Sequence, residues 1–284
     1  MARDTTPRRA RREPTFSVIG EYDDRRGKLC ERWLGGFGIV VRDYQKTELH
    51  VMLARVPATG EQACASLGIS RMRQTGKSFC ARLASLFWAV IEGKQILFSA
   101  HLTSTAWEHY DYLYNLCMDI PALRKEMAAR KPYNSQLGQL ELRFRNGGRI
   151  LFRTRSDRLL RGVSLDVIIY DEAQELTSAQ EAAVEPTTIA SKRSIFTIYL
   201  GTPPGPEARG DRFGAMRKAL KADPSPKDGV WWLEWGIDYV PEDPWSLDLW
   251  YDYVPSTDNG MRLDNIRKTI KKAEDTVDIP EEEA

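Results

Sequence analysis

The chain has 284 residues, of which 42% are hydrophobic, so it can bury the core of one large domain or of one domain with appendages. The formal net charge of +1 excludes a globally basic surface, and any nucleic-acid contact must therefore come from a local patch. The four cysteines form no C-x-x-C pair and the three histidines form no cluster, which argues against a disulfide framework and a zinc site. The sequence contains no run of 18 apolar residues, so it predicts no membrane-spanning helix.

Residues 1–35 are interpreted as a basic N-terminal tail and lead-in. The opening MARDTTPRRARREPT lacks hydrophobic periodicity and is predicted to be mobile, either as a solvated terminus or as a nucleic-acid contact. Regular patterning begins at about Gly36, and segment 40–56 predicts a helix that PATGE ends. Its apolar face consists of Val41, Tyr44, Leu49, Met52 and Leu53.

After this helix the pattern alternates between strand and helix. Segments 63–70 and 94–100 are short and apolar, which is typical of strands buried on both faces. Segments 79–93 and 103–118 predict helices, the first closed by Gly93. This order predicts parallel pairing in an α/β sheet.

Segment 140–155 alternates apolar and charged residues on both sides of Asn-Gly-Gly, which predicts a β-hairpin. The remaining elements predicted for the core are a strand at 166–172, a helix at 178–191 and a strand at 194–205. Beyond residue 205 the chain is irregular and rich in Trp and Pro. We therefore predict a core domain at 36–205 and a small lid or linker subdomain at 206–284.

The stretch SRMRQTGKSF, residues 70–79, ends like a phosphate-binding loop (Walker A motif). A predicted strand precedes Gly76-Lys77-Ser78 and a predicted helix follows it, as such a loop requires. Lys77 is expected to reach the β- and γ-phosphates, and the Ser78 hydroxyl to hold Mg²⁺. Arg71 stands where such a loop normally begins with glycine, so the motif departs from the general pattern.

Two acids follow the apolar strand in VIIYDEAQE, in the manner of a Walker B motif. The carboxyl ends of strands in an open α/β sheet face the ligand crevice. Asp171 is therefore expected to orient Mg²⁺ and Glu172 to activate water as a general base, with helix capping as the alternative interpretation. In YLGTPPG, Thr202 could face the γ-phosphate from a neighbouring strand, or could belong to an ordinary turn.

Together, RMRQTGKS, VIIYDEAQEL and YLGTPPG resemble the N-terminal ATPase of the large terminase subunit of tailed double-stranded-DNA phages, from about Val41 to the C-terminus. The resemblance implies a P-loop NTPase fold of the ASCE type, with a central, mostly parallel sheet flanked by helices. It also implies a Mg²⁺-dependent ATPase that moves double-stranded DNA into a procapsid. In that family the first loop glycine is commonly missing and arginine occurs within the loop.

The resemblance also assigns roles to individual residues. Arg73 would approach the γ-phosphate within one subunit, Gln45 would read the adenine edge, and Arg161 would serve the neighbouring subunit's nucleotide. Thr202 would belong to the motif that couples hydrolysis to movement. The residues expected to cradle the nucleotide are Arg71, Gln74, Thr75, Gly76, Lys77 and Ser78.

Implied partners are double-stranded DNA, the portal protein and the small terminase subunit, with no membrane. The resemblance implies a homo-oligomeric ring on the portal, although the isolated domain can be monomeric. It places the protein in the host cytoplasm and transiently at the procapsid portal, and outside the mature virion. The family's nuclease domain is expected to be absent from this chain, because no strand with an acidic triad follows the C-terminal amphipathic segment.

Three questions stay open at this point. The arginines between residues 143 and 161 could track DNA or a subunit interface, or form a solvated hairpin face with ion pairs. The cluster VWWLEWGIDYVPEDPW could stack bases or pack a lid. The function could instead be that of a helicase-like translocase, which needs a second motor domain, or of a structural subunit that binds ATP without hydrolysing it.

Overall fold

The computed structural model describes residues 9–136, 138–155, 164–184, 195–203, 208–226, 229–239, 241–243, 246–258, 264–265 and 268. Its strands are β1 (Phe16–Val18), β2 (Ser66–Ser70), β3 (Gln95–Ala100), β4 (Tyr133–Asn134), β5 (Glu141–Arg143), β6 (Arg149–Thr154), β7 (Val167–Tyr170), β8 (Phe196–Gly201) and β9 (Val230–Glu234). Its helices are α1 (Arg25–Gly35), α2 (Asp43–Met52), α3 (Lys77–Glu92), α4 (Thr103–Asp119), α5 (Pro121–Glu126), the 3₁₀ helix η1 (Ala173–Glu175), α6 (Ser178–Ala182), α8 (Arg212–Ala222) and α9 (Leu247–Tyr253).

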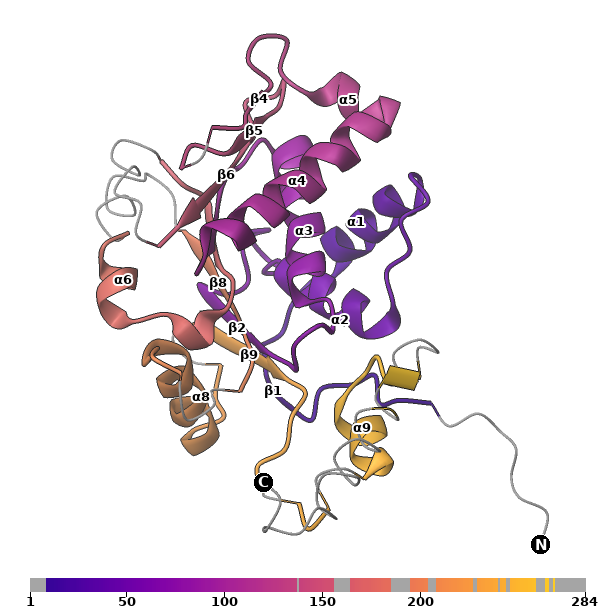
Figure 1. The fold of residues 1–284 in the computed structure, drawn as a ribbon, viewed down its shortest axis with the longest axis vertical. Helices are drawn as coiled ribbons and strands as arrows, with labels where there is room; N and C mark the ends of the chain where they lie inside the picture. Colours follow the sequence, from indigo (N-terminus) through magenta and orange to yellow (C-terminus); the bar gives the residue numbers. More distant parts are fainter. Residues whose placement is uncertain are drawn as a thin grey trace, which may run out of the picture.

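The described strands form one nine-stranded sheet in the order β1-β9-β2-β8-β7-β3-β6-β5-β4. The six strands from β9 to β6 are mutually parallel, while β1, β5 and β4 pair antiparallel at the two edges. Helices α1 to α4 cover one face of the sheet, and α6 and α8 lie on the other (Figure 1). The predicted α/β class with a mostly parallel sheet flanked by helices is confirmed.

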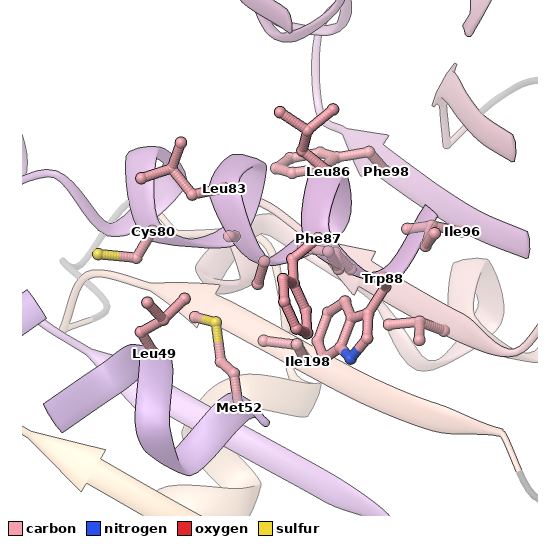
Figure 2. Packing of buried hydrophobic residues seen from close by; sticks show 14 of the residues in the cluster. Leu49, Met52, Cys80, Leu83, Leu86, Phe87, Trp88, Ile96, Phe98 and Ile198 are labelled. Atoms are coloured by element: carbon pink, nitrogen blue, oxygen red, sulfur yellow. The ribbon is translucent and has the colours of Figure 1, made fainter. Parts of the chain in front are cut away.

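Each central strand is buried on both faces, which explains its continuous apolar sequence. Along β3, Ile96 and Phe98 point into the core under α2 and α3, whereas Leu97 points into the second core under α8. In the first core, side chains from α3 meet those of α2 and of the sheet (Figure 2). Helix α3 is thus buried almost all round and fixed in place, and it is the helix that follows the phosphate loop.

The helix predicted at 40–56 forms as α2 over Asp43–Met52 only, and the five residues of its predicted apolar face are all buried, with Val41 and Leu53 just outside the helix. Gly93 ends α3 in the left-handed conformation, as expected. The hairpin β5–β6 forms around Asn146-Gly147-Gly148, and the Asn146 side chain donates to the Ala89 and Val90 carbonyls near the end of α3. The hairpin is therefore tied directly to the buried helix.

The prediction of a mobile N-terminal tail is wrong for residues 9–15. The Arg11 backbone N–H donates to the Tyr251 carbonyl at 2.8 Å, and Arg12 forms an ion pair with Asp258 at 2.7 Å. The Trp235 indole N–H donates to the Arg12 carbonyl. Backbone hydrogen bonds and individual side-chain contacts hold this segment in place. Contacts of this kind do not require a periodic pattern of apolar residues. Residues 1–8 lie outside the described part of the chain.

The predicted boundary at residue 205 also differs from the structure, because β9 lies inside the main sheet beside β2. Its Trp231 and Trp232, together with Trp235 just beyond it, are buried. Base stacking by these three tryptophans is therefore wrong, since their rings pack within the protein. Aromatic residues such as Trp are favoured in strands, so this segment carried a strand signal that the prediction of a lid did not use.

Most arginines of the predicted basic stretch have partners inside the protein. Arg143 and Arg149 both pair with the buried Glu141. Arg153 is itself buried and donates to the Leu140 carbonyl at 2.7 Å. The interpretation with ion pairs therefore describes Arg143 and Arg149, and DNA contact by the arginines of this stretch stays a prediction. Arg158 and Arg161 lie outside the described residues.

Within the described ranges, no helix combines the length and apolar character that a membrane crossing needs.

We expect Gly68→Ala to lower the free energy of unfolding by about 1–3 kcal/mol, because overpacking strains a core of fixed shape. A Cβ at Gly68, in the middle of β2, would lie 2.1 Å from the Trp232 ring. Gly35→Ala is the matched control, since a Cβ there meets nothing within 4 Å. Urea denaturation of both variants checks this, and equal stability of the two would contradict it.

Candidate nucleotide site

The phosphate loop connects β2 to α3 at the carboxyl edge of the sheet. Gly76 is the N-cap of α3 with a φ of +90°, a conformation that glycine adopts without steric cost. Gln74 also has a positive φ, of +57°. These two positions turn the chain so that the first N–H groups of α3, which have no partner within the helix, point out of the sheet edge. Such N–H groups and the helix dipole favour a bound phosphate.

Helix α2 supports the loop from behind. The Tyr44 hydroxyl donates to the Thr75 carbonyl at 3.2 Å. The Gln45 amide packs so close to Gly76 that a Cβ there would lie 2.7 Å from its nitrogen. Gln45 also accepts the Arg42 N–H with its side-chain oxygen. The loop therefore rests on a folded helix rather than projecting freely.

Arg71 points away from the phosphate side of the loop. Its side chain is fully buried, forms an ion pair with the equally buried Glu48 at 2.8 Å, and lies over the Tyr44 and Trp235 rings. Burial raises the pKa of Glu48, and the charge of Arg71 opposes that effect. The side chain predicted to help cradle the nucleotide instead joins the loop to α2 and to the residue after β9.

Lys77 begins α3 and has its ammonium group inside the loop. Its Nζ donates to the Arg71 carbonyl at 2.6 Å and to the Met72 carbonyl at 3.0 Å. Burial, with the nearby charge of Arg71, lowers the pKa of Lys77 to about 8, while Asp171 opposes the shift. The loop thus folds closely around its own lysine.

Asp171 lies at the end of β7 and contacts the start of α3. Ser78 Oγ donates to Asp171 Oδ2 at 2.7 Å, and the Glu172 N–H donates to Oδ1 at 3.0 Å. The buried His109 of α4 places Nε2 at 2.9 Å from Oδ2. Burial alone would raise the pKa of Asp171, but His109, Ser78 and the Glu172 N–H together hold it below its ordinary value. These contacts favour the charged form of the carboxylate, which is the form that attracts a cation.

Glu172 has a φ of +52°, which is unusual for a residue with a side chain. Arg155 stabilises this backbone, because its Nη2 donates to the carbonyl oxygens of both Asp171 and Glu172. Backbone strain of this kind costs about 1–3 kcal/mol and concentrates at functional sites. The strained turn brings Glu172 to the wall of the cavity described next.

One cavity of about 390 Å³ joins the loop, the acids and the end of β8. The predicted site residues that line it are Arg73, Gln74, Thr75, Gly76, Lys77, Ser78, Asp171, Glu172 and Thr202. Gln45 and Arg71 are not among the lining residues, and Arg161 lies outside the described part of the chain. The structure thus gathers the lysine and both acids, which come from distant parts of the sequence, around one space.

Sequence reasoning missed several residues of this cavity. Gln174 lines it, and its Oε1 accepts the Thr202 N–H at 3.1 Å, so the acid motif contacts the end of β8 directly. Arg82 lines it from α3 and lies over the Tyr112 ring at 4.4 Å. His109 lines it from α4. Gln174 belongs to the acid motif and could have been found there, whereas no local pattern marks Arg82 or His109.

The sheet, the loop at the start of α3 and the paired acids define a P-loop fold. No protein-family model matches the chain, and no curated protein matches its sequence. Among solved structures, the large terminase of bacteriophage HK97 is similar over 89% of this chain, with a TM-score of 0.67 and 15% sequence identity. This chain covers 52%, about half, of the HK97 protein. The predicted resemblance to large terminases is therefore confirmed at the level of the fold.

Two other solved structures have lower TM-scores. The large terminase ATPase domain of Thermus phage P74-26 has a TM-score of 0.47 and 22% identity, covering 66% of this chain and 72% of that one. A large terminase from a thermophilic bacteriophage, in complex with ADP, has a TM-score of 0.42 and 12% identity, covering 62% of this chain and 42% of that one.

We expect Arg71→Met to lower the free energy of unfolding by about 3–5 kcal/mol, because it leaves Glu48 buried without its partner. The double variant Arg71→Met/Glu48→Leu should recover most of that loss. Chemical denaturation gives the stabilities, and nucleotide titration of the folded protein gives the affinities. An Arg71→Met variant of unchanged stability but weakened nucleotide affinity would restore the direct role predicted from the sequence.

Proposed function

We propose that this chain is the ATP-hydrolysing motor of a large terminase subunit, which drives double-stranded DNA into a phage procapsid. The observation that carries the proposal is the single cavity that gathers Lys77, Asp171 and Glu172 within the fold of the HK97 large terminase. A phosphate loop beside paired acids favours hydrolysis over simple binding, because the second acid can activate water.

The donors around the cavity fit a magnesium ion bound with a nucleotide. Ser78 Oγ and Asp171 Oδ2 are hard oxygen donors 2.7 Å apart, and Mg²⁺ in phosphate sites takes few protein oxygens and keeps water and phosphate ligands. These two residues would hold the ion. When bound, Mg²⁺ would neutralise charge on the β- and γ-phosphate oxygens.

The chain's own groups would divide the remaining work. Lys77 would exchange its two loop carbonyls for phosphate oxygens, and the free N–H groups at the start of α3 would bind the same phosphates. Glu172 would accept a proton from the attacking water at its carboxylate. Arg73 lines the cavity four residues before Lys77 and would approach the γ-phosphate within the same subunit.

Other roles rest on the family resemblance. Thr202 would report the state of the γ-phosphate, and its hydrogen bond to Gln174 supports a link between hydrolysis and the end of β8. Gln45 would read adenine, and Arg161 would complete the site of a neighbouring subunit. The partners would be double-stranded DNA, the portal protein and the small terminase subunit, with a ring on the portal. The site of action would be the host cytoplasm, transiently at the procapsid portal.

We expect Glu172→Gln to lower ATP turnover by about 10²- to 10⁴-fold, the contribution typical of a general base, while ATP binding is retained. Steady-state phosphate release and equilibrium nucleotide binding test the two parts separately. Glu175→Gln is the matched control, because that acid of the same motif does not line the cavity and should keep near wild-type turnover. Wild-type protein that binds ATP but never hydrolyses it would favour a non-hydrolysing binding subunit.

We expect Arg161→Ala to lower turnover by about 10³- to 10⁵-fold if the arginine acts on a neighbouring subunit. Mixing this variant with Glu172→Gln should restore part of the activity, because the second variant can offer its Arg161 to the intact acid of the first. Mixing Glu172→Gln with the double variant Arg161→Ala/Lys77→Ala should restore none. Equal turnover by Arg161→Ala and the wild type in the assembled state would contradict the role.

A further inference from the structure

His109 occupies a position that packing alone does not explain. It lies on the inner face of α4, only 3% exposed, with its ring 4.3 Å from the Phe98 ring of β3. Both ring nitrogens are buried and neither makes a hydrogen bond of regular geometry to a described residue, although Nε2 lies within ion-pair distance of a carboxylate. A buried polar atom without a partner destabilises the fold, and an apolar side chain of similar size would avoid that cost. The contact that Nε2 makes gives a reason for a histidine at this position.

That contact is with Asp171. Nε2 lies 2.9 Å from Oδ2, the same oxygen that accepts the Ser78 hydroxyl. The other two contacts of the carboxylate come from the loop helix and from the adjacent backbone, so His109 is the contact that ties it to α4. Asp171 is thereby held from three directions, and the orientation of its carboxylate does not depend on Ser78 alone.

We propose that His109 is a positioning residue: through Nε2 it fixes the rotamer of Asp171 so that the carboxylate faces the divalent cation of a bound nucleotide. This inference rests on the proposed nucleotide site. The Phe98 ring packs against the histidine ring, which lies on the buried face of α4 beside the acid. Partners that orient metal-binding side chains typically change metal affinity by about 10- to 100-fold when removed.

The test compares His109→Leu and His109→Gln with the wild type. The probe is a fluorescent ADP analogue titrated with Mg²⁺ present and with the metal removed by EDTA. For His109→Leu we expect the Mg²⁺ concentration at half-saturation to rise about 10- to 100-fold, with metal-free affinity within about twofold of wild type. For His109→Gln, whose amide N–H can replace Nε2–H, we expect recovery to within a few-fold.

The control is His50→Gln, because His50 contacts Glu31 on α1 and does not line the cavity. Thermal melting identifies a variant that fails to fold. Unchanged Mg²⁺ half-saturation in His109→Leu would overturn the inference. So would an equal loss of affinity with and without metal in a folded variant, because that would show a general effect on the loop.

The outcomes also separate this inference from the proposed function. Wild-type protein that binds Mg²⁺ and ADP but does not hydrolyse ATP would end the motor proposal and leave the His109 result standing. Active wild-type protein whose His109 variants keep normal Mg²⁺ dependence would end the inference and leave the motor proposal standing.

Discussion

The hydrogen bond from Ser78 to Asp171 is the contact on which the site depends, because it joins two segments 93 residues apart at one edge of the sheet. It depends on β2 and β7 running parallel on either side of β8, with the end of β2 paired to Gly201 and the end of β7 paired to Tyr199. Backbone pairing with β8 sets this register, and apolar packing on both faces of the strands stabilises it. A small polar contact in the cavity is thus held in place by a large apolar core.

The loop is held from the side opposite the cavity. Arg71 is at the end of β2, where its φ is not positive, so the chain does not need glycine there. Its side chain turns into the core to meet Glu48, while the positions that do need unusual φ values are Gln74 and Gly76. The replacement of the usual first glycine is thus compatible with a formed loop, and it adds an ion pair that anchors the loop to α2.

The acid motif is held by several elements at once. Arg155 from the end of β6 binds its backbone, His109 from α4 binds Asp171, and Gln174 reaches the end of β8. Gly210 packs against the Gln174 carbonyl so closely that a Cβ there would lie 2.4 Å from it. A displacement of the acids would therefore alter their contacts with the end of β8 and with the segment before α8. These contacts connect the cavity to the segment before α8.

The sequence by itself determined the α/β class, the loop at residues 76–78 and the position of the acid pair after a buried strand, because hydrophobic patterning and a Gly-Lys-Ser between strand and helix are local signals. It also placed the apolar face of α2. Only the tertiary structure decided that Arg71 turns inward, that β9 joins the sheet, and that residues 9–15 are pinned to the chain near Tyr251. It alone brought His109 to Asp171. These features depend on contacts between residues far apart in the chain, and no local periodicity records such contacts.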